Sequence, residues 1–587
     1  MLGQPRLTRL FLSLWAIAAF VLEISAATSV RVFNRMQLER RAPLPTLPER
    51  FFIVSDDSQC RFDPVSQQCV PVEACTFQFR FGDLELSQSC RVRRLPEVHR
   101  TVTTDGLTSR SSAFLPQHVH LAYGGSNTGT SMTVSWSTFQ RLERPELRIG
   151  PHFENLKPAV DVSYVVDAYA VDASYSLYTY HATVTSLAPD TAYVFQVGAE
   201  GHAGQSSAFG AFRTARLPSI SSPDSGHVVI KSERPKPTSL LMYGDLGVEG
   251  PVNHAAIRYL EAQVNLSTVD FVLHLGDIAG ANRGSRSSGP QGALSMFRGF
   301  SFTYEDTLNR WMLSLQAVHL TVPYMVVPGD RDAACEELQC LFRASKRKHL
   351  GGFRAFNSRF RMPSSELSSA RNMWYSFDQG DVHFIVLSSE TNRTTSLHGP
   401  TANDTSAMTE QLMWLRNDLQ QAQDNRREVP WIVVAMHRPI YSVLHVDPTT
   451  LELTGDALRL QHAFEEIFVQ FSVDVVVSAH GDAYERSYPV SGGQTINGRI
   501  EQFGSVYVDP TAPVYVVTGS LDGLRHRSLG FRPQTTVAWS AKFDDQHFAA
   551  THLQADRSTL WLQTVCIGNN TGAVLDELAI VKTEAAA

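Results

Sequence analysis

The sequence has no excess of positive charge, no long apolar segment beyond its N-terminus and few cysteines. Its 51 Lys and Arg residues are outnumbered by 58 Asp and Glu residues, which gives a net charge of −7. Proteins that bind nucleic acid usually carry a basic patch, so this charge gives no reason to expect nucleic acid as a partner. No G-x-S-x-G motif follows a predicted strand, and GSRSSG at 284–289 lies in a loop-like run, which disfavours a serine hydrolase.

The N-terminus predicts entry into the secretory pathway. Arg6 and Arg9 precede an apolar run over 10–22, and the small residues SAAT follow, which is the layout of a signal peptide over 1–27. An uncleaved membrane anchor is the alternative, but the apolar run is shorter than the roughly 20 residues of a spanning helix. We therefore expect a secreted protein, extracellular or in the lumen of the secretory pathway, without a membrane span after removal of the signal. Four N-x-S/T sequons agree with this and predict glycosylation at Asn265, Asn392, Asn403 and Asn569.

The seven cysteines fit the same oxidising compartment. Four of them lie close together, which predicts a small module with two disulfides whose pairing stays open. These four are Cys60, Cys69, Cys75 and Cys90. A zinc site is the other interpretation, but the spacing contains no C-x-x-C. Cys335 and Cys340 can bridge locally, which leaves Cys566 as a free or intermolecular thiol.

A chain of 587 residues is too long for a single hydrophobic core, so we expect two or three domains. A leader and the small Cys-rich segment occupy 28–112. Short alternating strands such as SMTVSWST and TAYVFQVGA then predict an antiparallel β-sandwich over 113–215. The Pro- and Ser-rich stretch 216–238 is typical of a linker. From 239 to 587, apolar strands alternate with helical stretches, which predicts an α/β domain. The expected helices include 251–264 and 409–423.

Five strands of this α/β domain stop on residues that can bind a metal ion. SLLMY, FVLHL and PYMVVP end at Gly-Asp pairs, WIVVAM ends at a histidine, and VDVVVSA ends at His-Gly-Asp. The residues concerned are Asp245, Asp277, Asp330, His437 and His480, with Asp482 two positions further. A single Gly-Asp pair is an ordinary turn, but five such ends in one domain are harder to explain in that way. Ligands gather beyond the carboxyl ends of strands in α/β sheets, so we expect a metal site there.

The order of these motifs resembles the purple acid phosphatases, a family of the metallophosphoesterase superfamily. That family reads GDxG, GDxxY, GNHE, a histidine after a strand, and GHxH. The same places here read GDLG (244–247), GDIAG (276–280), GDRD (329–332), MHRPIY (436–441) and AHGD (479–482). Flanking sequences such as NMWYSFDQGDVHFIVLSSE and APVYVVTGS extend the resemblance over 113–583. It implies a fibronectin type III-like β-sandwich followed by an α/β metallophosphoesterase domain, with two mixed sheets flanked by helices.

The resemblance also implies an activity. Members of the family hold two metal ions, about 3.5 Å apart, that clamp a phosphate and generate hydroxide. The chain is accordingly expected to be a metal-dependent acid phosphatase that hydrolyses phosphate monoesters by attack of metal-activated hydroxide. By the same resemblance, Asp245 and the bridging Asp277 would bind the first metal. The ligands of the second metal would be Asp277, Asp330, His437 and His480.

Several positions depart from the family pattern. Gly280 replaces the tyrosine of the first metal, Asp330 the asparagine of the second, Arg331 the catalytic histidine, Asp332 the glutamate beside it, and Asp482 the second histidine of GHxH. Asp330 keeps an oxygen donor, whereas Gly280 removes a ligand. Asp482 is a weaker ligand candidate because its side chain is shorter than that of histidine. The identity of the one or two ions therefore stays open among Fe, Zn, Mn and Mg.

The substitution at 331 bears on the chemistry. Arginine stays protonated, so Arg331 can hold a phosphate through two N–H groups but cannot shuttle a proton. The alternative is a salt bridge from Arg331 to Asp330 or Asp332. A replacement proton donor is His445, eight residues beyond His437. The combined substitutions keep a second function open, namely a catalytically impaired pseudophosphatase that binds phosphate or a partner protein.

Overall fold

The fold is described here from a computed structural model. It describes residues 60–63, 68–71, 75–81, 84–90, 112–125, 128–172, 175–200, 206–218, 236–248, 252–279, 303–333, 351–363, 371–391, 402–481, 483–496, 499–501, 505–519, 521 and 537–583. Several predicted features lie outside these residues: the signal peptide at 1–27, Gly280, Cys335, Cys340, Asn392 and Asp482.

Two antiparallel hairpins occupy the predicted Cys-rich segment, where the description covers the backbone. They pair β1 (Cys60–Asp63) with β2 (Gln68–Pro71), and β3 (Cys75–Phe81) with β4 (Leu84–Cys90). The register of the second hairpin sets the backbone of Cys75 opposite that of Cys90. The two-disulfide module stays a prediction.

A sandwich of two four-stranded antiparallel sheets comes next. One sheet has the order β5 (Gln117–Tyr123), β6 (Met132–Thr138), β10 (Tyr175–Val184), β9 (Val162–Asp172), and the other β12 (Gly210–Arg213), β11 (Ala192–Ala199), β7 (Pro145–Gly150), β8 (Lys157–Pro158). Short 3₁₀ turns lie at Ser112–Phe114 and Phe153–Asn155. Trp136 stacks on Tyr180 with their ring centroids 5.4 Å apart, and both side chains are fully buried. This aromatic pair joins β6 and β10, which are neighbours in the first of these sheets.

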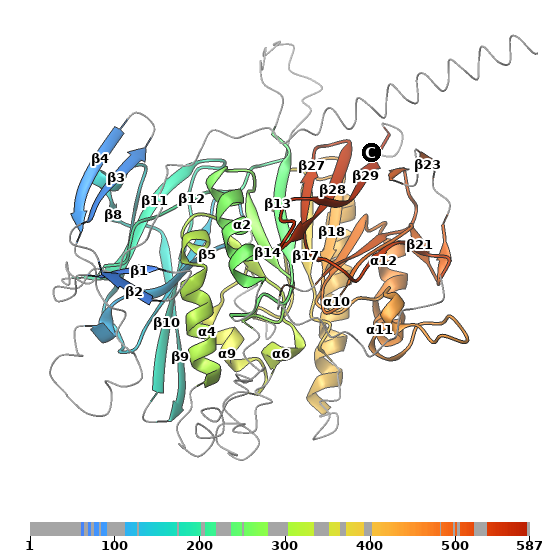
Figure 1. The fold of residues 1–587 in the computed structure, drawn as a ribbon, viewed down its shortest axis with the longest axis horizontal. Helices are drawn as coiled ribbons and strands as arrows, with labels where there is room; N and C mark the ends of the chain where they lie inside the picture. Colours follow the sequence, from blue (N-terminus) through green and yellow to red (C-terminus); the bar gives the residue numbers. More distant parts are fainter. Residues whose placement is uncertain are drawn as a thin grey trace, which may run out of the picture.

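Two larger sheets form the α/β domain, and Figure 1 shows them packed between helices on both sides. The first has eight strands in the order β15 (Tyr324–Val326), β14 (Phe271–His274), β13 (Thr238–Tyr243), β27 (Phe548–Ala555), β28 (Thr559–Ile567), β29 (Val574–Val581), β24 (Val506–Val508), β23 (Arg499–Glu501). The second has seven, in the order β16 (Tyr375–Gln379), β17 (Val382–Val386), β18 (Trp431–Ala435), β19 (Val475–Ser478), β25 (Val514–Thr518), β20 (Tyr484–Ser487), β26 (Ser540–Asp544). A small hairpin joins β21 (Val490–Ser491) to β22 (Gln494–Thr495).

Helices cover the outer faces of these sheets. Next to the first sheet lie α2 (Asn253–Asn265), α4 (Thr303–Ser314) and α5 (Gln316–His319), with the short α6 (Asp330–Ala333) and α9 (Arg354–Arg359) nearby (Figure 1). Beside the second lie α10 (Ala402–Asp424), α11 (Gly455–Leu460), the π-helical η4 (Gln461–Glu465) and α12 (Glu466–Gln470); the 3₁₀ turn η3 (Val443–His445) precedes α11. Both predicted helices are therefore present, as α2 and α10.

Both sheets are mixed, as expected for this fold class. In the first, β13, β14 and β15 run parallel, whereas β27 pairs antiparallel with β13. In the second, β17, β18, β19 and β25 run parallel. Phe271 of the first sheet packs against Phe377 and Phe384 of the second, with ring centroids 5.4 and 5.1 Å apart, so the core lies between the sheets.

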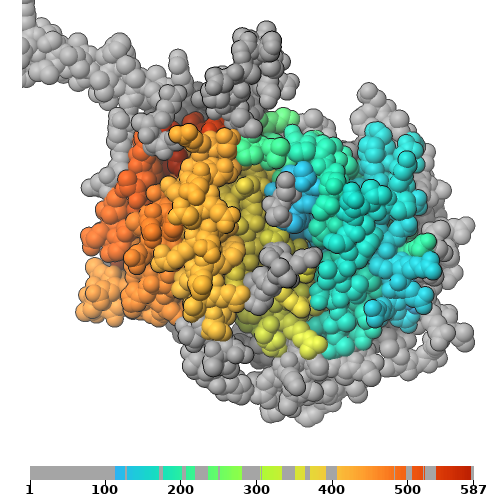
Figure 2. Space-filling model, turned by 180° about the vertical axis from the view of Figure 1, so that it is seen from behind, coloured from blue at the N-terminus to red at the C-terminus, as the bar shows by residue number. Residues whose placement is uncertain are grey.

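The β-sandwich packs against the first helical layer. The Tyr169 hydroxyl donates to Glu305 of α4 over 3.1 Å, and the Gln316 amide donates to the carbonyl of Val119 over 2.8 Å. Seen from behind, the turquoise sandwich lies against the yellow part of the α/β domain, with the orange segments beyond it (Figure 2). Within the described residues, no helix has the length and apolar character needed to cross a membrane.

Candidate metal centre

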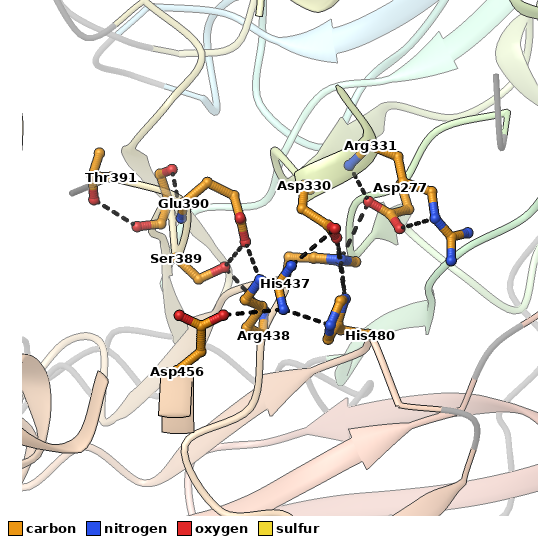
Figure 3. A network of polar contacts seen from close by, with 12 residues as sticks. Asp277, Asp330, Arg331, Ser389, Glu390, Thr391, His437, Arg438, Asp456 and His480 are labelled. Atoms are coloured by element: carbon orange, nitrogen blue, oxygen red, sulfur yellow. Dashed lines mark hydrogen bonds and ion pairs between the residues drawn. The ribbon is translucent and has the colours of Figure 1, made fainter. Parts of the chain in front are cut away.

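The five strand ends singled out in the sequence are carboxyl ends of parallel strands, three in the first large sheet and two in the second. Asp245, Asp277 and Asp330 follow β13, β14 and β15, which are parallel neighbours. His437 and His480 follow β18 and β19, which are parallel neighbours in the other sheet. The structure brings four of these side chains together: one ligand atom from each of Asp277, Asp330, His437 and His480 lies within 4.8 Å of the others (Figure 3).

The backbone at these strand ends is strained. Asp245, Asp277 and His480 have φ angles of 58°, 59° and 63°, in the left-handed region that non-glycine residues rarely adopt. Each such residue costs on the order of 1 kcal/mol or more, and residues of this kind cluster at functional sites. Gly276 has a φ of 89°, and a Cβ at this position would lie 2.6 Å from Nδ1 of His437. The Gly-Asp pair therefore allows the imidazole to approach the backbone closely.

His437 is fully buried and held in one orientation. Its Nδ1 is 2.7 Å from the carbonyl oxygen of Leu275, an arrangement in which Nδ1 donates. Its Nε2 then faces Asp330 Oδ1 at 3.1 Å and Asp277 Oδ1 at 3.3 Å. Burial opposes a charge on this imidazole, but the Asp277 and Asp330 carboxylates raise the pKa of His437 to about 10. The cluster therefore attracts positive charge to the position of His437 Nε2.

Two further members of the cluster, Asp330 and His480, differ in charge at pH 7. Burial opposes ionisation of Asp330, yet hydrogen bonds from His437 and His480 hold the pKa of this carboxyl well below its usual range. His480 Nδ1 lies 3.1 Å from Asp330 Oδ1. Burial lowers the pKa of His480 to about 4, so this imidazole is neutral at pH 7. Two carboxylates and two imidazoles form a donor set that suits borderline divalent ions. An ion would bind in place of the protons on His437 Nε2 and His480 Nδ1, so the residues present fit a metal ion.

Arg331 lies on the other side of Asp277. Its Nε is 3.1 Å from Asp277 Oδ2, and its Nη1 is 4.0 Å from Asp245 Oδ1. Its backbone N–H also donates to Asp277 Oδ1 over 2.9 Å. The alternative for Arg331 in the sequence was a salt bridge to Asp330 or Asp332; among the described residues its side chain instead contacts Asp277 and Asp245.

Asp332 organises the backbone beneath the cluster instead. Its Oδ2 accepts from the N–H groups of Asp277 and Gly329 over 3.0 and 2.9 Å, and its Oδ1 accepts from that of Ile278 over 3.0 Å. The carboxylate thereby ties the loop after β14 to the loop after β15. Because these loops carry Asp277 and Asp330, Asp332 fixes the position of two members of the cluster.

Sequence reasoning missed the residue at the centre of the polar network, Arg438 (Figure 3). Its guanidinium contacts Asp330 Oδ2 at 2.9 Å, Glu390 Oε1 at 2.9 Å, Asp456 Oδ2 at 3.3 Å and His480 Nε2 at 2.6 Å. A guanidinium only donates, so Nε2 of His480 accepts here. The available signal was the position of Arg438, directly after a histidine that follows a buried strand.

His445, the predicted proton donor, lies in η3 and is partly buried. Burial and the nearby positive charge of Arg438 lower its pKa, whereas Asp456 acts in the opposite direction. The structure therefore places His445 within electrostatic reach of the Arg438 network. Its role as an acid stays a prediction.

Comparisons with known proteins agree with this architecture. The family model "Purple acid Phosphatase, N-terminal domain" matches residues 116–214, and "Calcineurin-like phosphoesterase" matches 238–484. "Acid phosphatase type 7" of Danio rerio is 28% identical over 485 residues, which cover 80% of this chain and 91% of that protein. "Fe(3+)-Zn(2+) purple acid phosphatase 12" of Arabidopsis thaliana is 27% identical, over 73% of this chain and 77% of that protein.

A solved structure shares the fold. The purple acid phosphatase PPD1 from yellow lupin (Lupinus luteus) seeds superposes with a TM-score of 0.57 at 19% identity, covering 87% of this chain and 80% of that one. The predicted fold class, a fibronectin type III-like sandwich followed by a metallophosphoesterase domain with mixed sheets, is confirmed. With both family models in the expected order and the five strand ends in place, the chain belongs to the purple acid phosphatase family, with substituted active-site motifs.

Proposed function

We propose that this chain is a metal-dependent phosphatase that hydrolyses phosphate monoesters. The observation that carries the proposal is the convergence of Asp277, Asp330, His437 and His480, whose ligand atoms lie within 4.8 Å of one another. When bound there, a metal ion would supply Lewis acidity and lower the pKa of a water molecule. The names of the relatives, which are acid phosphatases, support the same class of reaction.

Two arginines would serve the substrate site at this centre, one by contact and one by positioning its neighbours. Arg331 lies beside Asp277 with its side chain 21% exposed, so part of its guanidinium can be reached by an incoming phosphate. Arg438 lies on the opposite side of Asp330, where Glu390 and Asp456 fix its orientation. Guanidinium groups bind phosphate through paired N–H donors, so Arg331 can orient the ester and stabilise negative charge on its oxygens. The Arg438 side chain is 6% exposed and already paired, so it would position Asp330 and His480.

His445 would supply the proton to the leaving alkoxide. Arginine at 331 cannot do so, because its guanidinium stays protonated. Burial lowers the pKa of His445, so its proton-donating form is populated at lower pH than that of an ordinary histidine.

The experiment compares metal content and turnover of the purified protein with those of His437→Ala. A generic phosphomonoester is assayed from pH 4 to 8, and bound metal is measured by mass spectrometry. His383→Ala is the matched control, because His383 is also largely buried between two carboxylates, Asp378 and Asp418, but lies near the start of β17, at the opposite end of that strand from the site. We expect His437→Ala to lose metal and turnover and His383→Ala to keep both. Absence of metal and of turnover in the unmodified protein would refute the proposal.

We further propose that the protein enters the secretory pathway. The signal-like N-terminus and the sequons support this, and two sequon asparagines, Asn265 and Asn569, are exposed in the structure. Expression in a eukaryotic host, followed by enzymatic removal of N-linked glycans, should lower the apparent mass of the product. An unchanged mass would contradict glycosylation at these sites.

A second candidate function is phosphate binding without turnover. It is favoured by one observation, the pairing of Arg331 with the two carboxylates assigned to the first metal. Tight binding of inorganic phosphate by a metal-loaded protein that hydrolyses no monoester would establish this alternative.

A further inference from the structure

We propose that the guanidinium of Arg331 takes the place of the first metal ion, so that the centre binds one divalent cation per chain. The inference deepens the proposed function and rests on it. It concerns the half of the site formed by Asp245, Asp277 and Arg331, where the substituted motifs differ most from the family pattern.

The Arg331 guanidinium lies beside the carboxylates of the first-metal half. Nε of Arg331 lies 3.1 Å from Asp277 Oδ2, and Nη1 lies 4.0 Å from Asp245 Oδ1. The same arginine thus faces Asp245 and Asp277, the two described carboxylates that the family resemblance assigns to the first metal; Asp482, the doubtful third, lies outside the described residues. A cation between these carboxylates would have to displace the guanidinium from Asp277.

Burial explains why these carboxylates need a counter-charge. The side chain of Asp277 is fully buried, and that of Asp245 is 3% exposed. A buried carboxylate without a nearby positive charge is costly, because it loses hydration and gains nothing in return. The charged end of Arg331 supplies this charge permanently, since its pKa keeps it protonated at every pH of interest.

The backbone holds Arg331 in this position. The Arg331 N–H donates to Asp277 Oδ1 over 2.9 Å, so one residue contacts both oxygens of the same carboxylate. Asp332, next in the chain, fixes the loop through the N–H groups of Gly329, Asp277 and Ile278. The guanidinium is therefore part of a tied loop, and its placement does not depend on a flexible side chain alone.

The side chains available as metal ligands in the two halves of the site also favour a single ion. Gly280 offers no side-chain ligand where the family has tyrosine. The other half keeps Asp330, His437 and His480 together with the shared Asp277. The first-metal half has therefore lost the tyrosine ligand and gained the cationic side chain of Arg331. The second-metal half has all four of its expected ligands.

The test uses Mn²⁺ as the probe on the full chain. The metal-free protein is titrated with Mn²⁺, the stoichiometry is read by calorimetry and mass spectrometry, and electron paramagnetic resonance reports whether bound ions are isolated or magnetically coupled. We expect one Mn²⁺ per chain with the spectrum of an isolated ion. Asp245→Asn should leave this stoichiometry unchanged, whereas His437→Ala should abolish binding.

Arg331→Ala gives the decisive comparison. Without the guanidinium, Asp245 and Asp277 should accept a second, weaker ion, and a coupled spectrum should develop at high Mn²⁺. Arg331→Lys, which keeps the charge, should stay at one ion. Two coupled ions in the unmodified chain would overturn the inference while leaving the proposed function intact, and absence of any bound ion would instead overturn the proposed metal dependence. If Arg331→Ala binds a second Mn²⁺ no more tightly than the unmodified chain does, the guanidinium does not exclude that ion and the inference is wrong.

Discussion

Replacing Asp332 with alanine should weaken the metal centre although Asp332 itself is not one of its four ligands. Its carboxylate accepts three backbone N–H groups, from Asp277, Ile278 and Gly329, over 2.9 to 3.0 Å. A buried donor left without an acceptor costs about 1–3 kcal/mol. Three such donors would lower the free energy of unfolding by about 3–6 kcal/mol, after partial relief by relaxation of the loops.

The effect on the metal follows from what these donors position. Without Asp332, the loops after β14 and β15 lose their common anchor, so Asp277 and Asp330 no longer hold their present separation. Outer residues that orient metal ligands typically contribute ten- to a hundredfold in affinity. We therefore expect the Mn²⁺ dissociation constant to rise by about this factor. The Mn²⁺ dissociation constant of Asp332→Asn should lie between those of the unmodified protein and Asp332→Ala, because the amide keeps one accepting oxygen.

The assay combines unfolding in urea with calorimetric titration of Mn²⁺, and it needs a control that loses a similar anchor elsewhere. Asp270 serves, because its buried Oδ2 accepts from the Ser239 N–H and pairs with Arg216, each at 2.9 Å, just before β14 begins. Asp270→Ala should lower the unfolding midpoint and leave Mn²⁺ affinity unchanged. If Asp332→Ala behaves in the same way, with unaltered Mn²⁺ affinity, the reasoning about the loops is wrong.

Two further predictions concern proton transfer and acid stability. His445→Gln should slow hydrolysis of an alkyl phosphate by at least tenfold but barely affect p-nitrophenyl phosphate, whose leaving group needs little protonation; equal losses on both substrates would exclude His445 as the proton donor. His118 and His120 are buried in the sandwich, and burial lowers their pKa values to about 3 and about 4. The Arg359 guanidinium adds to this effect at His118, whereas a hydrogen bond to the backbone of His118 opposes it at His120. Their pKa values in the folded protein lie below the unfolded value of 6.5, so below pH 6.5 the unfolded chain binds more protons than the folded one. The free energy of unfolding is therefore full above pH 6.5 and falls as the pH is lowered below it, by up to about 1.4 kcal/mol per pH unit for each histidine. Thermal unfolding from pH 7 to 5 should show this slope, and His120→Asn should reduce it; an unchanged slope would contradict the assignment.

The strand ends could be predicted because two local signals coincide there. A fully buried strand such as β13 or β19 reads as a continuous apolar run, and a Gly-Asp or His-Gly pair marks where it stops. Because the neighbouring strands are parallel, their carboxyl ends lie at the same edge of each sheet, and this follows from the sequence without any measured distance. The helix expected at 409–423 was harder to delimit: α10 begins at Ala402, in a polar stretch without apolar periodicity.

The Arg438 network could not be predicted because its members share no local pattern. Glu390 follows β17, Arg438 follows β18, and Asp456 lies in α11. Each is a single charged residue in an unremarkable context, and only the packing of three separate segments brings them within 3.3 Å. The pairing of Arg331 was missed for a related reason. Asp330 and Asp332 are its nearest carboxylates in the sequence, whereas the loop directs its side chain toward Asp277.

These pairings change how the substituted motifs are interpreted. Taken one at a time, Gly280, Asp330 and Arg331 look like unrelated departures from a two-metal site. In the structure, the carboxylate added at Asp330 lies 2.9 Å from the Arg438 guanidinium, and the guanidinium added at Arg331 lies between two retained carboxylates. Random loss of a metal site would leave buried carboxylates without counter-charges, which is costly. The described charges instead compensate one another, as expected for a centre that has changed its cation complement while keeping the geometry around Asp277.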